Sequence, residues 1–297
     1  MTKNIEKILG RTKIFKDTGK IDSIEKISTN KYKVEFKDTS YVFSILDLEE
    51  YESIENEDYI SSILTKAGLK PLNIYERGVL PDLSKSYKVF EYRKENSLKD
   101  ILEKPGSFNL ESLGLNLGKS LKKLHSVDPD KKVDWKDKFL TRSNNVFYKH
   151  GLSQIGDKDY ILTDFIESNR HLTENTPINL LYKNISPKNI RVYGNNELDL
   201  RGIKELDFGD GTRDFVEINK IAIKNPDFSK SVLKGYFDKA KASRKFFRLL
   251  ALYQATSLLE SLVDIREDKE SYLSEFEIES ILKMYDDFNR LSPSWID

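Results

Sequence analysis

The hydrophobic pattern of this chain changes its period at the polar connector 93–97, and this change constrains the fold more than any other feature. Before the connector, apolar residues alternate or run along four short segments, which predicts strands over 31–36, 40–46, 73–80 and 86–92. A helix is predicted over 60–69, where apolar residues have helical spacing and Gly68 offers an end. The first part of the chain is therefore expected to be rich in strands.

After the connector the apolar spacing becomes helical. It predicts helices over 110–127, parts of 133–174, 216–264 and 275–291, with short strands and loops over 180–206. The pattern predicts an α+β fold with a strand-rich N-terminal lobe over 1–92, a hinge over 93–97 and a larger helical lobe over 98–297.

Charge and composition limit the partners. The 49 Lys and Arg residues balance the 49 Asp and Glu residues, which argues against nucleic acid or a membrane surface as partner. Without cysteine there is no disulfide and no thiolate site, and the charged N-terminus does not resemble a signal peptide. The longest apolar stretch, 246–263, contains Arg248 and Glu260 and predicts a buried helix. We expect a cytoplasmic protein that binds a small molecule or another protein.

The residues with the most informative chemistry lie in 180–210, which reads LLYKNISPKNIRVYGNNELDLRGIKELDFGD. This segment resembles the catalytic and metal-binding segment of aminoglycoside phosphotransferases and choline kinases. Their pattern is His-Gly-Asp, two residues, Pro, one residue, Asn, a strand, a turn, and Ile-Asp-Trp or Ile-Asp-Phe. Here Tyr182–Lys183–Asn184, Pro187, Asn189 and Leu206–Asp207–Phe208 keep that spacing.

Three further segments resemble the same family. Residues 113–129 resemble its helix that ends in Leu-His-Ser, and residues 88–102 resemble its hinge, with Glu91 and Tyr92 on the nucleotide side. Residues 208–215 place Asp214 at the aspartate of the family's Asp-Leu-Ala motif. The resemblance extends over roughly residues 20–290 and implies a two-lobed protein-kinase-like fold, with a small antiparallel sheet in the N-terminal lobe.

The resemblance assigns the catalytic base to position 184. Asn184 carries no charge and cannot accept the proton of an acceptor hydroxyl, and loss of general-base catalysis costs about 10²–10⁴-fold in rate. A plain turn-capping role for Asn184 is the alternative. Its neighbour Lys183 could neutralise a transferring phosphoryl group.

The resemblance assigns magnesium to Asn189 and Asp207. An amide oxygen and a carboxylate are ligands that Mg²⁺ accepts. The alternative is that Asn189 is a turn residue beside Pro187 and that Asp207 is a strand-end residue beside Gly209.

The N-terminal lobe departs from the family pattern in two places. Ser44 stands on the third strand where the resemblance places a phosphate-binding lysine, and Lys33 on the neighbouring strand is a candidate substitute. Glu57 or Glu55 would be the helix glutamate that pairs with such a lysine. The phosphate-covering loop falls on 26–31, KISTNK, which has no glycine, so only polar groups such as Ser28 remain to contact phosphate. An ordinary hairpin turn is the alternative.

Three functions remain open. The preferred one is a pseudokinase-like protein with impaired phosphoryl transfer, which binds a small molecule or a protein partner and need not use a cofactor. The second is an active but divergent phosphotransferase that uses ATP or GTP with Mg²⁺ on an alcohol group of an aminoglycoside, choline or a sugar-like molecule. The third is an unrelated α+β binding protein.

Overall fold

The computed structural model of the chain describes residues 2–51, 54–183, 185–194, 196–203, 205–238 and 240–297. The chain divides into two compact units. The N-terminal unit comprises Met1–Lys66 and Lys70–Glu95, and the C-terminal unit comprises Ala67–Leu69 and Asn96–Asp297.

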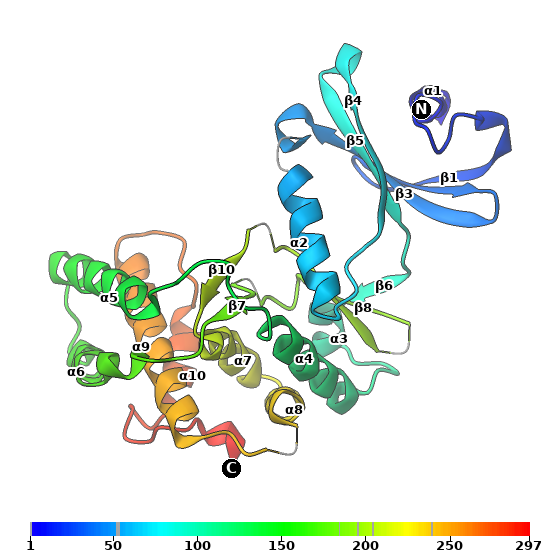
Figure 1. Ribbon diagram of the computed structural model, residues 1–297. Helices are drawn as coiled ribbons and strands as arrows, with labels where there is room; N and C mark the ends of the chain where they lie inside the picture. The colour runs from blue at the N-terminus through cyan, green and yellow to red at the C-terminus, as the bar shows by residue number, and fades with distance from the viewer. Residues whose placement is uncertain (1, 52–53, 184, 195, 204, 239) are drawn as a thin grey trace. The chain divides into compact units, whose positions relative to one another are not determined.

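The N-terminal unit is built on a five-stranded antiparallel sheet in the order β1-β2-β3-β5-β4 (Figure 1). Its strands are β1 (Ile21–Ser28), β2 (Lys31–Phe36), β3 (Thr39–Asp47), β4 (Ile74–Leu80) and β5 (Lys85–Glu91). Lys37 and Asp38, both with positive φ, form the two-residue turn between β2 and β3. The hairpin predicted from 31–46 is therefore confirmed.

The two faces of this sheet have different chemistry. One face buries Tyr32, Val34 and Phe36 of β2 against the core that contains Leu9 of helix α1 (Thr2–Leu9) and Phe15. On β2 the alternate residues, Lys31, Lys33 and Glu35, are partly or fully exposed on the other face. Helix α2 (Ile54–Lys66) lies on that second face (Figure 1). The second face therefore carries the unit's functional candidates.

The C-terminal unit is mostly helical. Its helices are α3 (Leu98–Glu103), α4 (Leu110–Leu124), α5 (Trp135–Leu152), α6 (Asp159–Asn169), α7 (Phe215–Ala222), α8 (Pro226–Phe237), α9 (Arg244–Arg266) and α10 (Glu275–Met284). Short strands are β6 (Glu95–Ser97), β7 (Asn179–Leu181), β8 (Ile190–Tyr193), β9 (Glu197–Leu200) and β10 (Asp207–Gly209). β7 pairs with β10, and β8 pairs with β9, both antiparallel.

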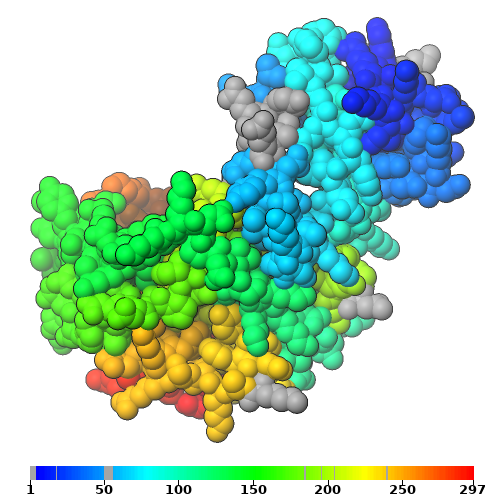
Figure 2. Space-filling model, viewed as in Figure 1, coloured from blue at the N-terminus to red at the C-terminus, as the bar shows by residue number. Residues whose placement is uncertain are grey.

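Helix packing organises this unit. Helices α4 and α8 touch through glycine, because a Cβ atom on Gly118 would lie 2.1 Å from the carbonyl oxygen of Val232. Helix α9 is buried along most of its length, as the sequence predicted for 246–263. In the space-filling view of Figure 2, the atoms coloured green and those coloured yellow to orange lie directly against one another. In the part of the chain that is described, no helix is both long and apolar enough to cross a membrane.

Some predicted boundaries were wrong. The helix expected over 216–264 is three helices, because Pro226 starts α8 and Ser243 caps α9 through a hydrogen bond from the backbone N–H of Phe246. Helix α2 begins at Ile54, six residues before the predicted start, because its first turns are acidic and carry little apolar signal. The sequence prediction also missed α1, β1 and α3.

Candidate functional site

The segment after β7 carries the residues that the resemblance singled out. Tyr182 is buried, and its hydroxyl donates a hydrogen bond to the carbonyl oxygen of Arg201 (2.7 Å) and also lies 3.3 Å from the carbonyl oxygen of Asn189. Lys183 follows with φ of 54°, a left-handed conformation that costs a side-chain-bearing residue about 1 kcal/mol. Asn184 lies outside the described residues, so its loss of a base function stays a prediction.

Asp214 holds this segment in place. Its carboxylate accepts hydrogen bonds from the backbone N–H of Tyr182 (2.7 Å) and Lys183 (3.3 Å), and it lies 3.1 Å from Nε2 of His125. The other ring nitrogen of His125 lies 2.9 Å from the hydroxyl of Tyr236. Asp214 is 6% exposed, so its interactions are made inside the unit. The sequence placed Asp214 in the motif but gave no sign of this bracing role.

Asp207 is the first residue of β10 and is surrounded by lysines. Lys138 of α5 lies 3.1 Å from its Oδ1, and Lys183 lies 3.2 Å from its Oδ2. Lys183 also donates to Glu205 at 3.0 Å. Partial burial works against the charge of Lys183, yet the bonds to Glu205 and Asp207 raise its pKa above the ordinary lysine value. Sequence reasoning missed Lys138, because it lies 69 positions before Asp207 and in no motif.

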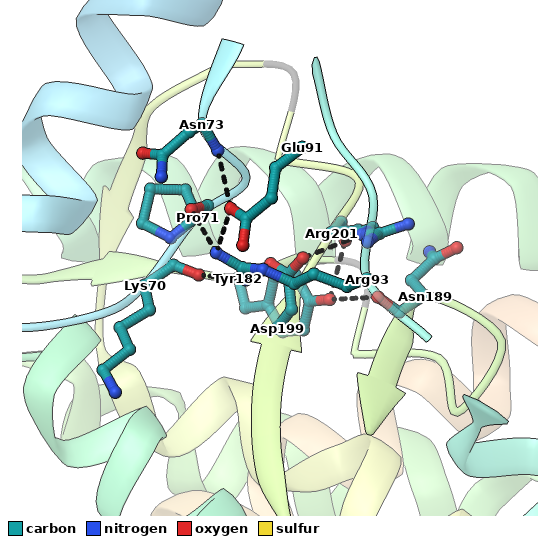
Figure 3. A network of polar contacts seen from close by, with 9 residues as sticks. All are labelled: Lys70, Pro71, Asn73, Glu91, Arg93, Tyr182, Asn189, Asp199 and Arg201. Carbon is teal, nitrogen blue, oxygen red and sulfur yellow. Dashed lines mark hydrogen bonds and ion pairs between the residues drawn. The ribbon is translucent and has the colours of Figure 1, made fainter. Parts of the chain in front are cut away.

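A magnesium ion does not fit these contacts well. Both carboxylate oxygens of Asp207 already face ammonium groups, which would repel a divalent cation. Among the described residues, no group of three or more acidic or histidine side chains is arranged to hold a metal. Asn189 uses its backbone carbonyl for Tyr182 and for the N–H of Arg201 (Figure 3). The magnesium assignment to Asn189 and Asp207 stays a prediction, and the charges around Asp207 count against it.

The N-terminal unit has a lysine–glutamate ion pair, made by a lysine that the sequence analysis did not single out. Ser44 on β3 is buried, and its direct neighbour on β5 is Lys88. The ammonium group of Lys88 lies 2.7 and 2.8 Å from the two carboxylate oxygens of Glu57 on α2. Arg77 of β4, the next residue in the same cross-strand row, also binds Glu57 at 2.9 Å. Directly opposed residues share a face of the sheet, so the register of β3 and β5 was the missing signal.

The predicted substitute, Lys33, has other partners. Its ammonium group lies 2.7 Å from Glu35 and 4.7 Å from the centre of the Tyr92 ring. The side chain of Glu55 lies outside the described residues. The structure therefore assigns the helix glutamate's partner to Lys88 and not to Lys33.

Two other nucleotide-side candidates have structural contacts. The Glu91 carboxylate accepts hydrogen bonds from Arg93 (2.8 Å) and from the backbone N–H of Asn73 (3.4 Å), and Figure 3 shows it pointing toward them. The hydrogen bond from Arg93 lowers the pKa of Glu91, against the opposing effect of partial burial. Ser28 ends β1 opposite Lys31, so residues 26–31 form the turn of the β1–β2 hairpin. A hairpin is compatible both with a phosphate-covering loop and with an ordinary turn, so the assignment of Ser28 stays a prediction.

Among the cavities of the C-terminal unit, two share lining residues and lie next to the segment after β7. The larger, of about 610 Å³, is lined by Lys183, Arg213 and the acidic residues Asp214, Glu217, Glu260, Asp264 and Glu270. Burial raises the pKa of Glu217 to about 7, and its carboxylate accepts a hydrogen bond from the hydroxyl of Tyr272. The smaller, of about 230 Å³, is lined by Lys138, Asp207, Arg213 and aromatic side chains. Arg142, Arg213 and Ser257 line both.

No family model and no curated protein sequence matches the chain. Solved structures do match over most of its length. Aminoglycoside phosphotransferase APH(4)-Ia aligns with a TM-score of 0.60 at 12% identity, covering 90% of this chain and 93% of that one. The chain has the fold of the aminoglycoside phosphotransferases and choline kinases.

Two solved structures from the choline kinases are similar as well. A choline/ethanolamine kinase family protein from Mesorhizobium loti aligns with a TM-score of 0.56 at 13% identity, covering 97% of this chain and 93% of its own. Choline kinase LicA from Streptococcus pneumoniae aligns with a TM-score of 0.52 at 12% identity, covering 96% and 98%. The predicted two-lobed α+β fold is confirmed, and the third reading, an unrelated fold, is excluded.

Proposed function

We propose that this chain is a kinase-like binding protein with impaired phosphoryl transfer, whose larger cavity holds a small polar molecule. One observation carries the proposal: both oxygens of Asp207 are paired with lysines. Phosphoryl transfer in kinases depends on divalent cations that neutralise the phosphates and on a positioned base. Lysines at Asp207 oppose the metal, and Asn184 offers no carboxylate.

The mixed charge of the larger cavity supports a polar, charged ligand. Its described lining includes five acidic side chains, of which Glu217 has a pKa raised to about 7, together with two arginines and two lysines, so both signs of charge are present. A volume of about 610 Å³ falls within the usual range for small-molecule sites. APH(4)-Ia, which shares the fold, has been solved with hygromycin B. Hygromycin B and choline are therefore suitable first probes for this cavity.

The test measures turnover and binding separately. The purified chain is incubated with Mg²⁺ and ATP or GTP, with hygromycin B, choline or no acceptor, and nucleotide hydrolysis and product phosphorylation are followed. We expect no turnover above that of a heat-inactivated control. Turnover that is abolished by Asp207→Asn would show an active site and overturn the proposal.

Binding is read from thermal melting without nucleotide. A ligand at 100 times its dissociation constant stabilises the folded chain by about 2.7 kcal/mol. We expect a shift with at least one cationic probe, which Asp264→Asn reduces. Asp164→Asn, an exposed change on α6, is the matched control and leaves the shift unchanged. Equal shifts in all three proteins would place the ligand elsewhere.

The Lys88–Glu57 ion pair favours a second candidate function, an active but divergent phosphotransferase. Kinase-like folds use such a pair to place the phosphates of ATP, and here Lys88 stands in for the lysine absent from β3. APH(4)-Ia has been solved with ADP and with AMP-PNP. If this second candidate is right, Lys88→Met abolishes stabilisation by ATP or GTP with Mg²⁺. Lys85→Met, on the same strand but paired with Asp47, preserves that stabilisation.

A further inference from the structure

The smaller cavity of the C-terminal unit is strongly basic. Its described lining contains Lys138, Arg142 and Arg213, with Asp207 as the single carboxylate among the described lining residues. Arg142 is ion-paired with Glu260 at 2.5 Å, and Lys138 is ion-paired with Asp207. Trp135, Phe139 and Tyr253 supply an aromatic wall, and Thr256 and Ser257 add hydroxyl groups. The positive charge of Arg213, unpaired within the described residues, lies beside hydroxyl donors and favours an anion.

Arg213 is the centre of this charge. Its side chain is partly buried and lines both cavities, and within the described part of the chain its guanidinium has neither an ion pair nor a hydrogen bond. A partly buried guanidinium is normally paired, since removing it from water is costly without a partner. Its fork of N–H donors matches the oxygens of a phosphate.

The backbone that carries Arg213 is fixed before any ligand arrives. Arg213 lies in the short helix Gly211–Asp214, which Asp210 caps by accepting a hydrogen bond from the N–H of Thr212 at 2.9 Å. The other oxygen of Asp210 accepts from the hydroxyl of Tyr253 at 2.8 Å, and Trp135 donates to that hydroxyl at 2.8 Å. A fixed backbone leaves only the Arg213 side chain to be ordered on binding, which lowers the entropy cost.

The lysines at Asp207 retain donors for a ligand. An ammonium group has three N–H donors, and Lys138 uses one on Asp207 at 3.1 Å and a weak one on the carbonyl of Phe208 at 3.4 Å. Lys183 binds Asp207 and Glu205. Both ammonium groups therefore lie beside Asp207, where the resemblance places a metal ion.

We propose that Lys138, Lys183 and Arg213 form a metal-independent binding site for a phosphate group, with the two ammonium groups at Asp207 taking the place of a divalent cation. This inference rests on the proposed function, because it explains how a chain with impaired phosphoryl transfer still recognises a phosphorylated molecule. The phosphate can belong to a nucleotide or to a small phosphomonoester, and no bond is made or broken in the site.

The experiment measures binding of inorganic pyrophosphate by calorimetry at constant ionic strength, in EDTA and in excess Mg²⁺. We expect binding in EDTA that Mg²⁺ does not strengthen. Arg213→Gln should weaken it by at least about tenfold, Lys138→Gln by several-fold, and Arg213→Lys should recover part of the loss. The control is Lys136→Gln, which removes an exposed lysine of the same helix that pairs with Glu174. ADP and phosphocholine as further ligands distinguish the two sources of the phosphate.

Three outcomes overturn this inference: pyrophosphate binds only with Mg²⁺, it does not bind at millimolar concentration, or Arg213→Gln binds as well as the parent while both melt at the same temperature. The turnover assay separates this inference from the proposed function. Metal-independent pyrophosphate binding together with acceptor phosphorylation would remove the proposed function and leave the phosphate site standing. Pyrophosphate binding that requires Mg²⁺, without turnover, would remove the phosphate site and leave the proposed function standing.

Discussion

The two units of this protein meet the same electrostatic need in different ways. In the N-terminal unit the lysine expected on β3 is replaced by Ser44, and Lys88 on the adjacent strand pairs with Glu57. In the C-terminal unit Asp207 stands at its expected position, but its partners are Lys138 and Lys183. In the N-terminal unit the cation is still a lysine, but it stands on a neighbouring strand. In the C-terminal unit two lysines stand where a metal ion was expected. A partly buried carboxylate needs a nearby cation, whereas the source of that cation is free to vary.

The largest expected effect tests whether Asp214 braces the segment that positions Lys183 beside Asp207. Asp214→Asn removes the charge that accepts hydrogen bonds from Tyr182 and Lys183 and that faces His125. Because the group is buried and multiply bonded, we expect a loss of about 3 kcal/mol in the free energy of unfolding, measured in urea. Asp164→Asn should cost less than about 0.5 kcal/mol. Similar losses in both variants would show that Asp214 does not brace the segment.

A second test concerns Glu217, which is partly buried and accepts a hydrogen bond from Tyr272. Folding raises its pKa from 4.5 to about 7, so the folded chain binds this proton more tightly than the unfolded chain. The stabilisation is complete below pH 4.5 and is lost as the pH rises to about 7, by about 3 kcal/mol in total.

The measurement compares unfolding free energies between pH 4.5 and 8 for the parent and Glu217→Gln. We expect the variant to lose the downward slope, since its amide does not titrate. Glu279→Gln, an exposed change on α10, should keep the parent slope. A parent curve parallel to that of Glu217→Gln would contradict a raised pKa. Tyr272, Lys220 and Glu277 are the groups that act on Glu217.

The third test asks whether Lys88 has truly replaced a β3 lysine as the partner of Glu57. A double-mutant cycle with Lys88→Met and Glu57→Gln should give a coupling energy of about 1 kcal/mol, because Lys88 is mostly buried while Glu57 is partly exposed. The exposed pair Lys85–Asp47 is the matched control and should couple by about 0.3 kcal/mol. Equal coupling energies in the two cycles would show that the Lys88–Glu57 pair is no stronger than an ordinary surface pair, and that Lys88 does not replace the expected lysine.

The smallest expected effect is the stability difference between two variants of Lys183, which separates the strain of its backbone conformation from the loss of its charge. Lys183→Gly and Lys183→Ala both remove the ammonium group beside Asp207, but glycine adopts a φ of 54° without penalty. The glycine variant should therefore be more stable than the alanine variant by about 0.5–1 kcal/mol. Urea unfolding gives the difference directly, and equal stabilities would mean that the left-handed conformation is not strained.

The elements that the sequence predicted are those whose signal is local. The alternation along 31–36 and 40–46 correctly predicted β2 and β3, and the apolar spacing over 110–127 correctly predicted α4. Helix α1 and the start of α2 were missed, since few apolar residues mark them. Pro226 marks the start of a new helix, but the apolar spacing continues on both sides of this residue, so the prediction missed the break.

The site divides in the same way. The resemblance to a known family placed Asn189 and Asp207 in one functional segment and Asp214 in the motif that follows it. It could not show that Lys138, on a helix far back in the chain, reaches Asp207, nor that β3–β5 register sets Lys88 beside Ser44. Those two contacts changed the interpretation of the site, one by opposing a metal and the other by restoring an ion pair.

By itself, the sequence determined the α+β class, the strand-then-helix order and the motif positions, because these depend on periodicity and spacing along the chain. Only the tertiary structure decided which cation meets each carboxylate. An ion pair needs two charged atoms within a few ångströms, and helix packing and strand register, not distance along the sequence, bring Lys138 to Asp207 and Lys88 to Glu57.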